Sequence, residues 1–172
     1  MTEPSADELR SWLDESYAAS MRTAFLILGN RHDAEDAVQE SFLRVWKFRD
    51  SLKNGRSFRP WLYRVVVNTC NSKLRQEIPR WGREESLETS GESPSRDDEF
   101  GRIARSHDVA SAVFDLPAPL RIVVVLRYFA ELSEREIAVA INRQPGTVKS
   151  RLHEARRRLA LHPSLSTTEQ TG

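Results

Sequence analysis

The stretch over residues 132–159, LSEREIAVAINRQPGTVKSRLHEARRRL, predicts more about the fold than any other part of the chain. Ser133 and Glu136 have the spacing of a capping box, in which each side chain bonds the backbone N–H of the other residue at the start of a helix. Asn142 follows the apolar residues of this short helix, and Asn tolerates the left-handed conformation that ends a helix. A basic second helix begins at Pro145, so the stretch predicts a helix-turn-helix with a recognition helix; the alternative is an ordinary helical hairpin with a basic surface.

Apolar spacing predicts helices along the rest of the chain as well. Three consecutive valines begin at Val65, but they lie in a longer pattern with apolar residues every three or four positions, which favours a helix over a strand. In an earlier helix, the stripe that contains Phe42, Val45 and Trp46 is expected to bury itself against its neighbours. The fold class is therefore all-α, with helices expected over about 9–28, 33–46, 57–74, 109–113, 119–129, 134–141 and 145–161.

The composition divides these helices into two groups. Residues 84–99 hold seven acids against one arginine and have almost no apolar side chains, so burial there cannot offset the entropy cost of ordering. We expect two small helical domains joined by a flexible acidic linker, and a disordered tail at the end of the chain. The expected bounds are 5–78 for the first domain, 79–103 for the linker, 104–161 for the second domain and 162–172 for the tail.

The formal net charge of +1 hides a strong segregation of charge along the sequence. Residues 1–41 carry a net charge of −6, whereas residues 42–83 carry +9, and residues 143–158 hold six basic residues against one acid. Blocks of opposite sign indicate several surfaces with different partners, and the two basic blocks are candidate polyanion sites. Solvated helix faces remain the alternative reading of each block.

Several classes of protein are excluded by the composition. No apolar run approaches the roughly 18 residues of a membrane span, and the acidic N-terminus does not resemble a signal peptide. The single cysteine, Cys70, excludes a disulfide framework and fits a reducing cytoplasm. We therefore expect a cytoplasmic protein that does not insert into membranes and needs no cofactor.

Two further segments carry a resemblance to a known family. DAEDAVQESFLRVW (33–46), followed by FRPWLYRVVVNTCNSKLR (58–75), resembles region 2 of bacterial RNA polymerase sigma factors of the extracytoplasmic-function (ECF) group. The 132–159 stretch resembles region 4 of the same family, although Arg143 stands in the turn where the family usually has an apolar residue. That departure could weaken the packing of the turn or add a phosphate contact. The resemblance implies an alternative sigma factor that binds core RNA polymerase and directs promoter-specific transcription initiation.

The resemblance also assigns roles to residues and partners. It implies docking of region 2 on the β′ clamp helices, contact of region 4 with the β flap, reading of the minus-ten and minus-thirty-five promoter elements, and, commonly in the family, an anti-sigma factor. The expected core-binding residues are Asp36, Gln39, Glu40 and Leu43; the expected minus-ten residues are Arg56, Ser57, Phe58, Trp61, Arg64, Asn68 and Asn71; the expected minus-thirty-five residues are Lys149, Ser150, Arg151, His153, Glu154, Arg156 and Arg157.

Two of these side-chain types match the chemistry of base recognition. Lys donates to guanine acceptors and Glu accepts from cytosine in the major groove. For Phe58 and Trp61, core packing is the competing role, whereas Asn68 is a polar side chain among valines and so is the better candidate for contact with an unpaired base.

The sequence also offers some support for two other classes of function. His32-Asp33 and His107-Asp108 resemble the dipeptides of metal-dependent phosphohydrolases, but further ligands at helical spacing are missing from the sequence, so we expect no enzyme. A stand-alone helix-turn-helix regulator that never binds polymerase would explain region 4 but not the resemblance of 33–75 to region 2.

Overall fold

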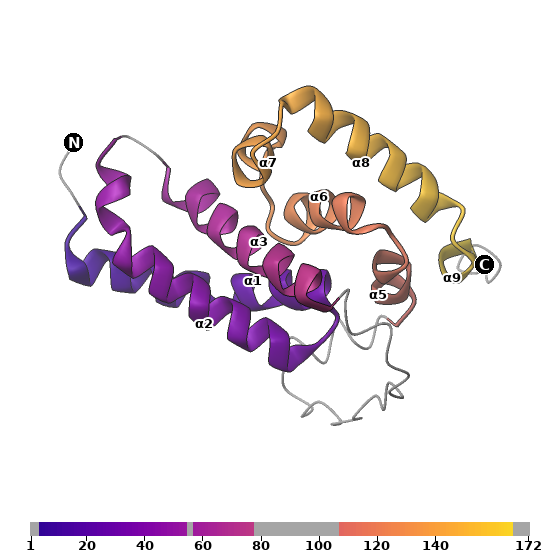
Figure 1. Ribbon diagram of the computed structural model, residues 1–172. Helices are drawn as coiled ribbons and strands as arrows, with labels where there is room; N and C mark the ends of the chain where they lie inside the picture. Colours follow the sequence, from indigo (N-terminus) through magenta and orange to yellow (C-terminus); the bar gives the residue numbers. More distant parts are fainter. Residues whose placement is uncertain (1–3, 55–56, 78–106, 167–172) are drawn as a thin grey trace.

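The computed structural model describes residues 4–54, 57–77 and 107–166, and within these ranges the regular elements are all helices (Figure 1). This confirms the all-α fold class. The expected linker over 79–103 lies outside the described residues. The elements are α1 (Ala6–Leu28), α2 (Arg31–Lys47), the 3-10 helix η1 (Arg49–Asn54), α3 (Phe58–Glu77), α5 (His107–Phe114), α6 (Ala118–Tyr128), α7 (Glu134–Ile141), α8 (Pro145–Ala160) and α9 (Pro163–Ser166).

The N-terminal half, α1 to α3, is a bundle in which each helix contacts the other two. A capping box begins α1, with the Glu8 amide donating to the Ser5 hydroxyl at 3.2 Å and the Ser5 amide donating to Glu8 at 2.8 Å. The same helix ends at Gly29, whose φ of 76° is the left-handed conformation that glycine adopts without strain. The bundle encloses fully buried apolar side chains, among them Leu26, Ile27, Val38, Leu62 and Val66.

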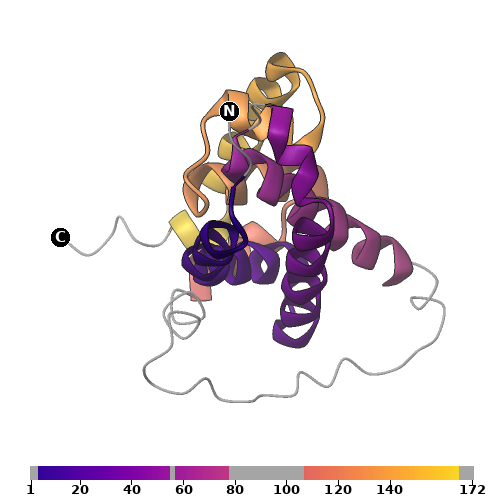
Figure 2. The ribbon, with the colours of Figure 1, turned by 90° about the vertical axis from the view of Figure 1, so that its left-hand side faces the viewer.

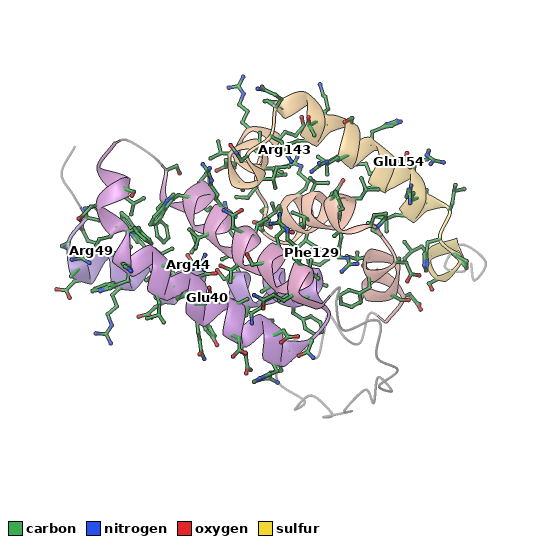
Figure 3. The ribbon with its side chains drawn as sticks, in the orientation of Figure 1. Glu40, Arg44, Arg49, Phe129, Arg143 and Glu154 are labelled. Atoms are coloured by element: carbon green, nitrogen blue, oxygen red, sulfur yellow. The ribbon has the colours of Figure 1, made fainter. Side chains whose placement is uncertain are left out.

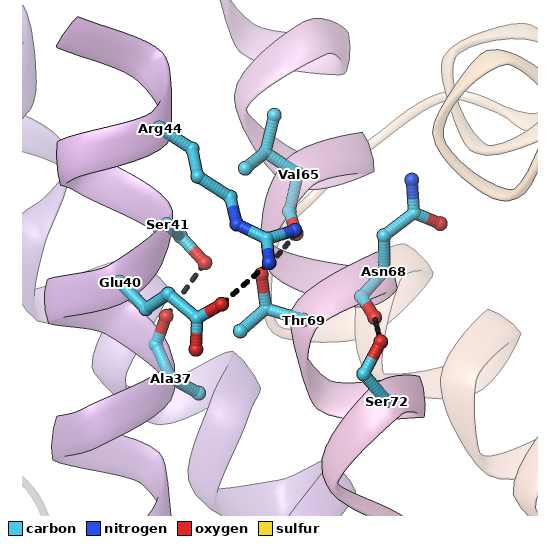
Figure 4. A network of polar contacts seen from close by, with 8 residues as sticks. All are labelled: Ala37, Glu40, Ser41, Arg44, Val65, Asn68, Thr69 and Ser72. Carbon is cyan, nitrogen blue, oxygen red and sulfur yellow. Dashed lines mark hydrogen bonds and ion pairs between the residues drawn. The ribbon is translucent and has the colours of Figure 1, made fainter. Parts of the chain in front are cut away.

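Two buried hydroxyls lie on α2 and α3 and are satisfied within their own helices. Ser41 donates to the Ala37 carbonyl at 2.6 Å, and Thr69 donates to the Val65 carbonyl at 2.9 Å (Figure 4). These two hydroxyl groups are therefore buried without being left unpaired, which would otherwise cost stability.

The C-terminal half, α5 to α9, is built around α6. Five consecutive residues of α6, Ile122 to Leu126, are buried, because α7 and α8 pack on this helix from one side and α1 and α5 from others. Asn142 ends α7 with φ 52°, so the predicted left-handed residue of the turn is confirmed. The predicted capping box is confirmed as well, with Ser133 and Glu136 exchanging bonds of 2.7 and 3.2 Å.

The end of the chain differs from the expectation of a disordered tail from residue 162. A short helix, α9, follows α8 and packs against α5. His162 Nε2 lies 2.8 Å from Asp115 Oδ2, and the Ser164 amide donates to His162 Nδ1 at 3.3 Å. Pro163 starts this new turn, a position where its missing N–H is not needed. Residues 167–172 lie outside the described part.

The two halves pack against each other, with α7 lying on α3 and both α5 and α6 contacting α1 (Figures 1 and 2). The rings of Phe25 and Phe114 meet edge to face, with centroids 6.0 Å apart. Buried side chains consequently form one continuous core that runs from Leu9 in α1 to Ala155 in α8. Sequence periodicity predicted the helices of each half but gave no indication of this contact.

Candidate nucleic-acid and protein interfaces

The exposed face of α8 brings together three of the residues expected to read DNA. Lys149, Ser150 and His153 are all exposed, and they are spaced so that all three lie on one side of the helix. The opposite side is fixed by the buried residues Val148, Leu152 and Ala155, which pack into the core. The burial of one face therefore determines that the other faces solvent, as a recognition helix requires.

Glu154 lies on the same helix (Figure 3) but is already engaged by two arginines. Its carboxylate accepts from Arg157 at 2.8 and 3.0 Å and from Arg158 Nε at 2.8 Å. These bonds from Arg157 and Arg158 lower the pKa of Glu154 to about 2, so the group is ionised at neutral pH. A cytosine amino group would have to compete with both guanidinium groups for this carboxylate.

The remaining basic residues near α8 have distinct surroundings. Arg156 Nε donates to the Tyr128 hydroxyl at 2.7 Å, and its guanidinium lies 5.8 Å from the centre of the same ring. Arg151 is half-buried. Arg143 is exposed at the turn between α7 and α8 (Figure 3), so its side chain does not enter the packing of the turn.

The four expected core-binding residues form one exposed strip on α2. Asp36, Gln39, Glu40 and Leu43 are all exposed, and Leu43 has 71% of its surface accessible. Glu40 accepts from Arg44 at 2.6 Å (Figure 4), while Asp36 lies 3.6 Å from His32 Nε2 and 4.0 Å from Lys73 Nζ. Each acid therefore has a cation close by and is only weakly held, because exposed ion pairs contribute little.

An apolar groove beside this strip was not predicted from the sequence. It has a volume of about 450 Å³ and is lined by residues of α1 and α2: Leu13, Tyr17, Val38, Gln39, Phe42, Leu43 and Trp46. The expectation that the Phe42 stripe is buried is wrong for Trp46, which is 40% exposed at the end of the groove. Trp46 lies one turn after Leu43, and that spacing was the sequence signal that the two share a surface.

The expected minus-ten residues are not all equally accessible. Asn68 is exposed and its amide points away from α2 (Figure 4), whereas Arg64 and Asn71 are half-buried. Trp61 is only 8% exposed and belongs to the core. Ser57 is exposed, Phe58 is half-buried, and Arg56 lies outside the described residues.

A second pocket of about 450 Å³ opens where α3 begins, next to α1. Its lining residues are Trp12, Glu15, Ser16, Ala19, Ser57, Phe58, Arg59 and Tyr63. The Trp12 and Phe58 rings are tilted against each other with centroids 5.1 Å apart, and burial raises the pKa of Tyr63. Aromatic walls with one guanidinium suit a stacked base and its phosphate. Sequence reasoning missed Trp12 here, because α1 is distant from α3 in sequence, and it also missed Tyr63, which lies on α3 itself.

We see neither a metal-binding group nor a reactive thiol among the described residues. No group of three or more His, Cys, Asp or Glu side chains within 4–54, 57–77 and 107–166 could hold a metal ion. Burial raises the pKa of the Cys70 thiol to about 12, so this thiol is poorly reactive. None of the described helices is both long and apolar enough to cross a bilayer.

The exposed basic face of α8, the aromatic pocket beside α3 and the exposed strip on α2 are features typical of a DNA-binding protein with a protein partner. Comparisons identify its family. Residues 14–78 match the model of Sigma-70 region 2, and residues 108–159 match that of Sigma-70 region 4. The ECF RNA polymerase sigma factor SigW of Bacillus subtilis (strain 168) is 32% identical over 166 residues, which cover 90% of this chain and 86% of the relative.

The chain belongs to the ECF sigma factors of the sigma-70 family. It is an alternative sigma factor that binds core RNA polymerase and directs promoter-specific transcription initiation; a stand-alone regulator is not favoured.

Two solved structures share the fold. The structure of CnrH in complex with the cytosolic domain of CnrY has a TM-score of 0.66 at 21% identity and covers 91% of this chain and 88% of that one. The sigma factor RpoE in complex with the anti-sigma factor NepR from Bartonella quintana has a TM-score of 0.68 at 21% identity, with 92% and 99% covered.

Proposed function

We propose that the two halves divide promoter recognition between them, with region 4 over 104–161 reading the minus-thirty-five duplex and region 2 over 5–78 capturing the minus-ten element. The exposed face of α8 supports the first assignment, because Lys149, Ser150 and His153 share it while the opposite face is buried. Arg151, Arg156 and Arg157 hold phosphates in this arrangement, and Glu154 reads a base only after releasing an arginine.

The proposal for region 2 centres on the pocket at the start of α3. An unpaired base of the nontemplate strand stacks between its aromatic walls, Trp12 and Phe58, while the exposed Asn68 amide contacts the strand further along the same helix. Arg56, Ser57, Arg64 and Asn71 contact the backbone or adjacent bases. Trp61 supports this surface from the core, since only 8% of it is accessible.

Core RNA polymerase docks on the α2 strip and the adjoining apolar groove. Asp36, Gln39 and Glu40 face the basic side of the β′ clamp helices, and the 71% exposed Leu43 inserts as an apolar anchor. This single observation carries the docking assignment: a leucine exposed beside an aromatic groove is the kind of surface that a protein partner covers. Region 4 contacts the β flap.

Regulation and cellular setting follow from the same assignment. An anti-sigma factor would bind the α2 strip and so prevent core polymerase from binding there. The protein acts in the cytoplasm, needs no cofactor and performs no catalysis itself, because the chemistry of RNA synthesis belongs to the polymerase.

The docking assignment is tested by charge reversal on α2. Asp36→Lys combined with Glu40→Lys should weaken binding to core polymerase by about 2 kcal/mol, or roughly 30-fold, because both acids lie on the proposed interface. Glu35→Lys is the matched control: it reverses an acid of the same helix, paired with Arg31 at 3.0 Å, that is not one of the four strip residues and lies at the edge of their face. Fluorescence anisotropy with purified core measures the affinity, and run-off transcription measures the consequence. Equal affinities for the double variant and the control, with normal circular dichroism, would disprove the docking surface.

A further inference from the structure

One pair of exposed side chains, Tyr128 and Arg156, joins α6 to α8. Arg156 donates from Nε to the hydroxyl of Tyr128, the last residue of α6, at 2.7 Å. The centre of the Tyr128 ring lies 5.8 Å from the guanidinium carbon, so the ring also attracts the positive charge. Because α6 and α8 pack against each other (Figure 1), the pair makes one surface out of two helices.

Both side chains keep hydrogen-bond donors for a ligand. Arginine has five N–H donors, and within the described part of the chain Arg156 uses Nε alone. Its two Nη groups stay available and form a fork that matches two oxygens of a phosphate. The Tyr128 hydroxyl accepts the bond from Arg156, so its own proton is free to be donated. Tyr128 is 51% exposed and Arg156 is exposed as well, so a ligand can reach these donors from solvent.

The contact with Tyr128 leaves the positive charge of Arg156 in place. The next two arginines of α8 differ, because Arg157 and Arg158 each bond the Glu154 carboxylate at 2.8 Å. Tyr128 brings no formal charge, so an anion that approaches Arg156 does not compete with a carboxylate in this pair. The pair therefore favours an anionic ligand with several acceptor oxygens, and a phosphate is such a group.

Tyr128 is held in place by the helix that carries it. Residues Ile122 to Leu126 of α6 are buried, and Arg127 donates to the Leu132 carbonyl at 3.0 Å, which ties the end of α6 to the segment before α7. A fixed tyrosine limits the rotamers of Arg156, so less conformational entropy is lost when a ligand binds. Tyr128 is thus a positioning residue for Arg156 as well as a donor itself.

The place of Arg156 on α8 indicates which phosphate it meets. Lys149, His153 and Arg156 follow one another at spacings of four and three, so they lie on one face of the helix. From Lys149 to Arg156 the helix rises by about 10 Å, and the major groove is about 12 Å wide. When Lys149 faces a base edge inside the groove, Arg156 therefore lies at the rim, where the sugar-phosphate backbone runs. Tyr128 approaches the same strand from α6.

We propose that Tyr128 and Arg156 together bind one backbone phosphate of the minus-thirty-five duplex, with the Arg156 fork and the Tyr128 hydroxyl donating to its oxygens. The inference rests on the proposed placement of α8 in the major groove. It adds a residue of α6, outside the helix-turn-helix, to the DNA interface. This contact contributes affinity and register but no sequence preference, because every nucleotide carries the same phosphate.

The test is a phosphate scan with the holoenzyme. Methylphosphonate replaces one phosphate at a time across the minus-thirty-five duplex, and closed-complex affinity is measured for core polymerase with the wild-type chain, Tyr128→Phe or Arg156→Ala. One of the sensitive positions should lower wild-type affinity about tenfold, the scale of a hydrogen bond to a charged group. That position should lose its effect in both variants, while the other positions keep theirs. On unmodified DNA, Tyr128→Phe should weaken binding alike for all minus-thirty-five sequences.

Arg135→Ala is the matched control for the loss of an arginine. Arg135 is exposed in the same half but lies on α7, away from the face of α8 that carries Arg156. In this variant the position that depends on Tyr128 and Arg156 should keep its full effect. Circular dichroism and thermal unfolding of each variant show that it is folded.

The outcomes separate this inference from the proposed function. A wild-type phosphate profile in Tyr128→Phe would overturn it, whatever Arg156→Ala does, because Tyr128 would then only join α6 to α8. Loss of the same position's effect in Arg135→Ala would overturn it as well, since any lost charge would act alike. Base preference is measured separately with Lys149→Ala: an unchanged preference would contradict the proposed placement of α8, whereas the phosphate scan alone decides the role of Tyr128.

Discussion

The two halves expose recognition surfaces that are assembled in different ways. In the C-terminal half, the residues proposed to read the duplex lie on one helix, α8, which a capped helix and a tight turn precede within 28 consecutive residues. In the N-terminal half, the pocket and the groove are each formed by two helices. Trp12 of α1 meets Phe58 of α3 in the pocket, and Tyr17 of α1 meets Phe42 of α2 in the groove, with ring centroids 6.1 Å apart in the second pair. A surface that lies on one helix depends less on the packing of the other helices than a surface that two helices form together.

The prediction with the largest expected effect concerns whether the two halves unfold as one unit. Leu152 is fully buried in α8, so Leu152→Ala should lower the free energy of unfolding by about 2–5 kcal/mol. All four tryptophans lie at positions 12, 46, 61 and 81, none of them in the C-terminal half. If the halves unfold as one unit, the urea midpoint by tryptophan fluorescence shifts together with that by circular dichroism. A fluorescence midpoint that stays at its wild-type value would show independent domains.

Base reading by the C-terminal half is the next largest effect. Lys149→Ala and His153→Ala should each change sequence preference within the minus-thirty-five element by about 1–3 kcal/mol, because both side chains face the major groove in the proposal. Arg156→Ala should instead weaken binding to all sequences alike and reduce the salt slope by about one. Competition binding with a library of duplex sites measures both. Equal losses on every sequence for all three variants would disprove the placement of α8.

The corresponding test for the N-terminal half concerns promoter melting. In the holoenzyme, Asn68→Ala should reduce discrimination between minus-ten sequences by about 1–3 kcal/mol, the scale of a base-specific contact, and slow open-complex formation more than closed-complex binding. Permanganate reactivity of unpaired thymines, at equal promoter occupancy, measures the opening. Ser72→Ala is the control, because Ser72 lies one turn further along α3, is exposed, and donates to the Asn68 carbonyl at 3.0 Å. Normal opening by Asn68→Ala would refute the role of this amide.

The smallest expected effect compares the two capping boxes, one in each half. Ser5→Ala and Ser133→Ala should each cost about 1 kcal/mol of unfolding free energy. We expect the larger loss at Ser133, because α7 has only eight residues and contacts α3, α6 and α8, whereas the first turn of α1 is largely exposed and can fray. Urea titration of both variants under identical conditions measures the difference, and a larger loss at Ser5 would contradict this reasoning.

The sequence predicted those features that depend on neighbouring residues. The all-α class, the capping box at Ser133 and the left-handed Asn142 follow from local propensities and spacing, and the structure confirms them. The site residues on α2 and α8 could be placed on exposed faces for the same reason, since helical periodicity tells which side chains share a face.

Features that depend on contacts between distant helices could not be predicted. Periodicity placed Trp46 on an apolar face, but it could not show that α1 leaves this side chain 40% exposed in a groove. Nor could it show that Arg59 would reach the carbonyl of Ala130, 71 residues further along the chain. The division into two domains missed this contact because charge and apolar content describe segments rather than their partners.

The contact between α3 and α7 also has a consequence for protein synthesis. Translation proceeds from the N-terminus at about 5–20 residues per second, so roughly 3–13 s elapse between completion of Glu77 and completion of Ile141. During that interval the nascent α1–α3 bundle exists without the helices that later cover α1 and α3. On the ribosome, the faces of α1 and α3 that later contact α5, α6 and α7 are therefore uncovered until the C-terminal helices are made.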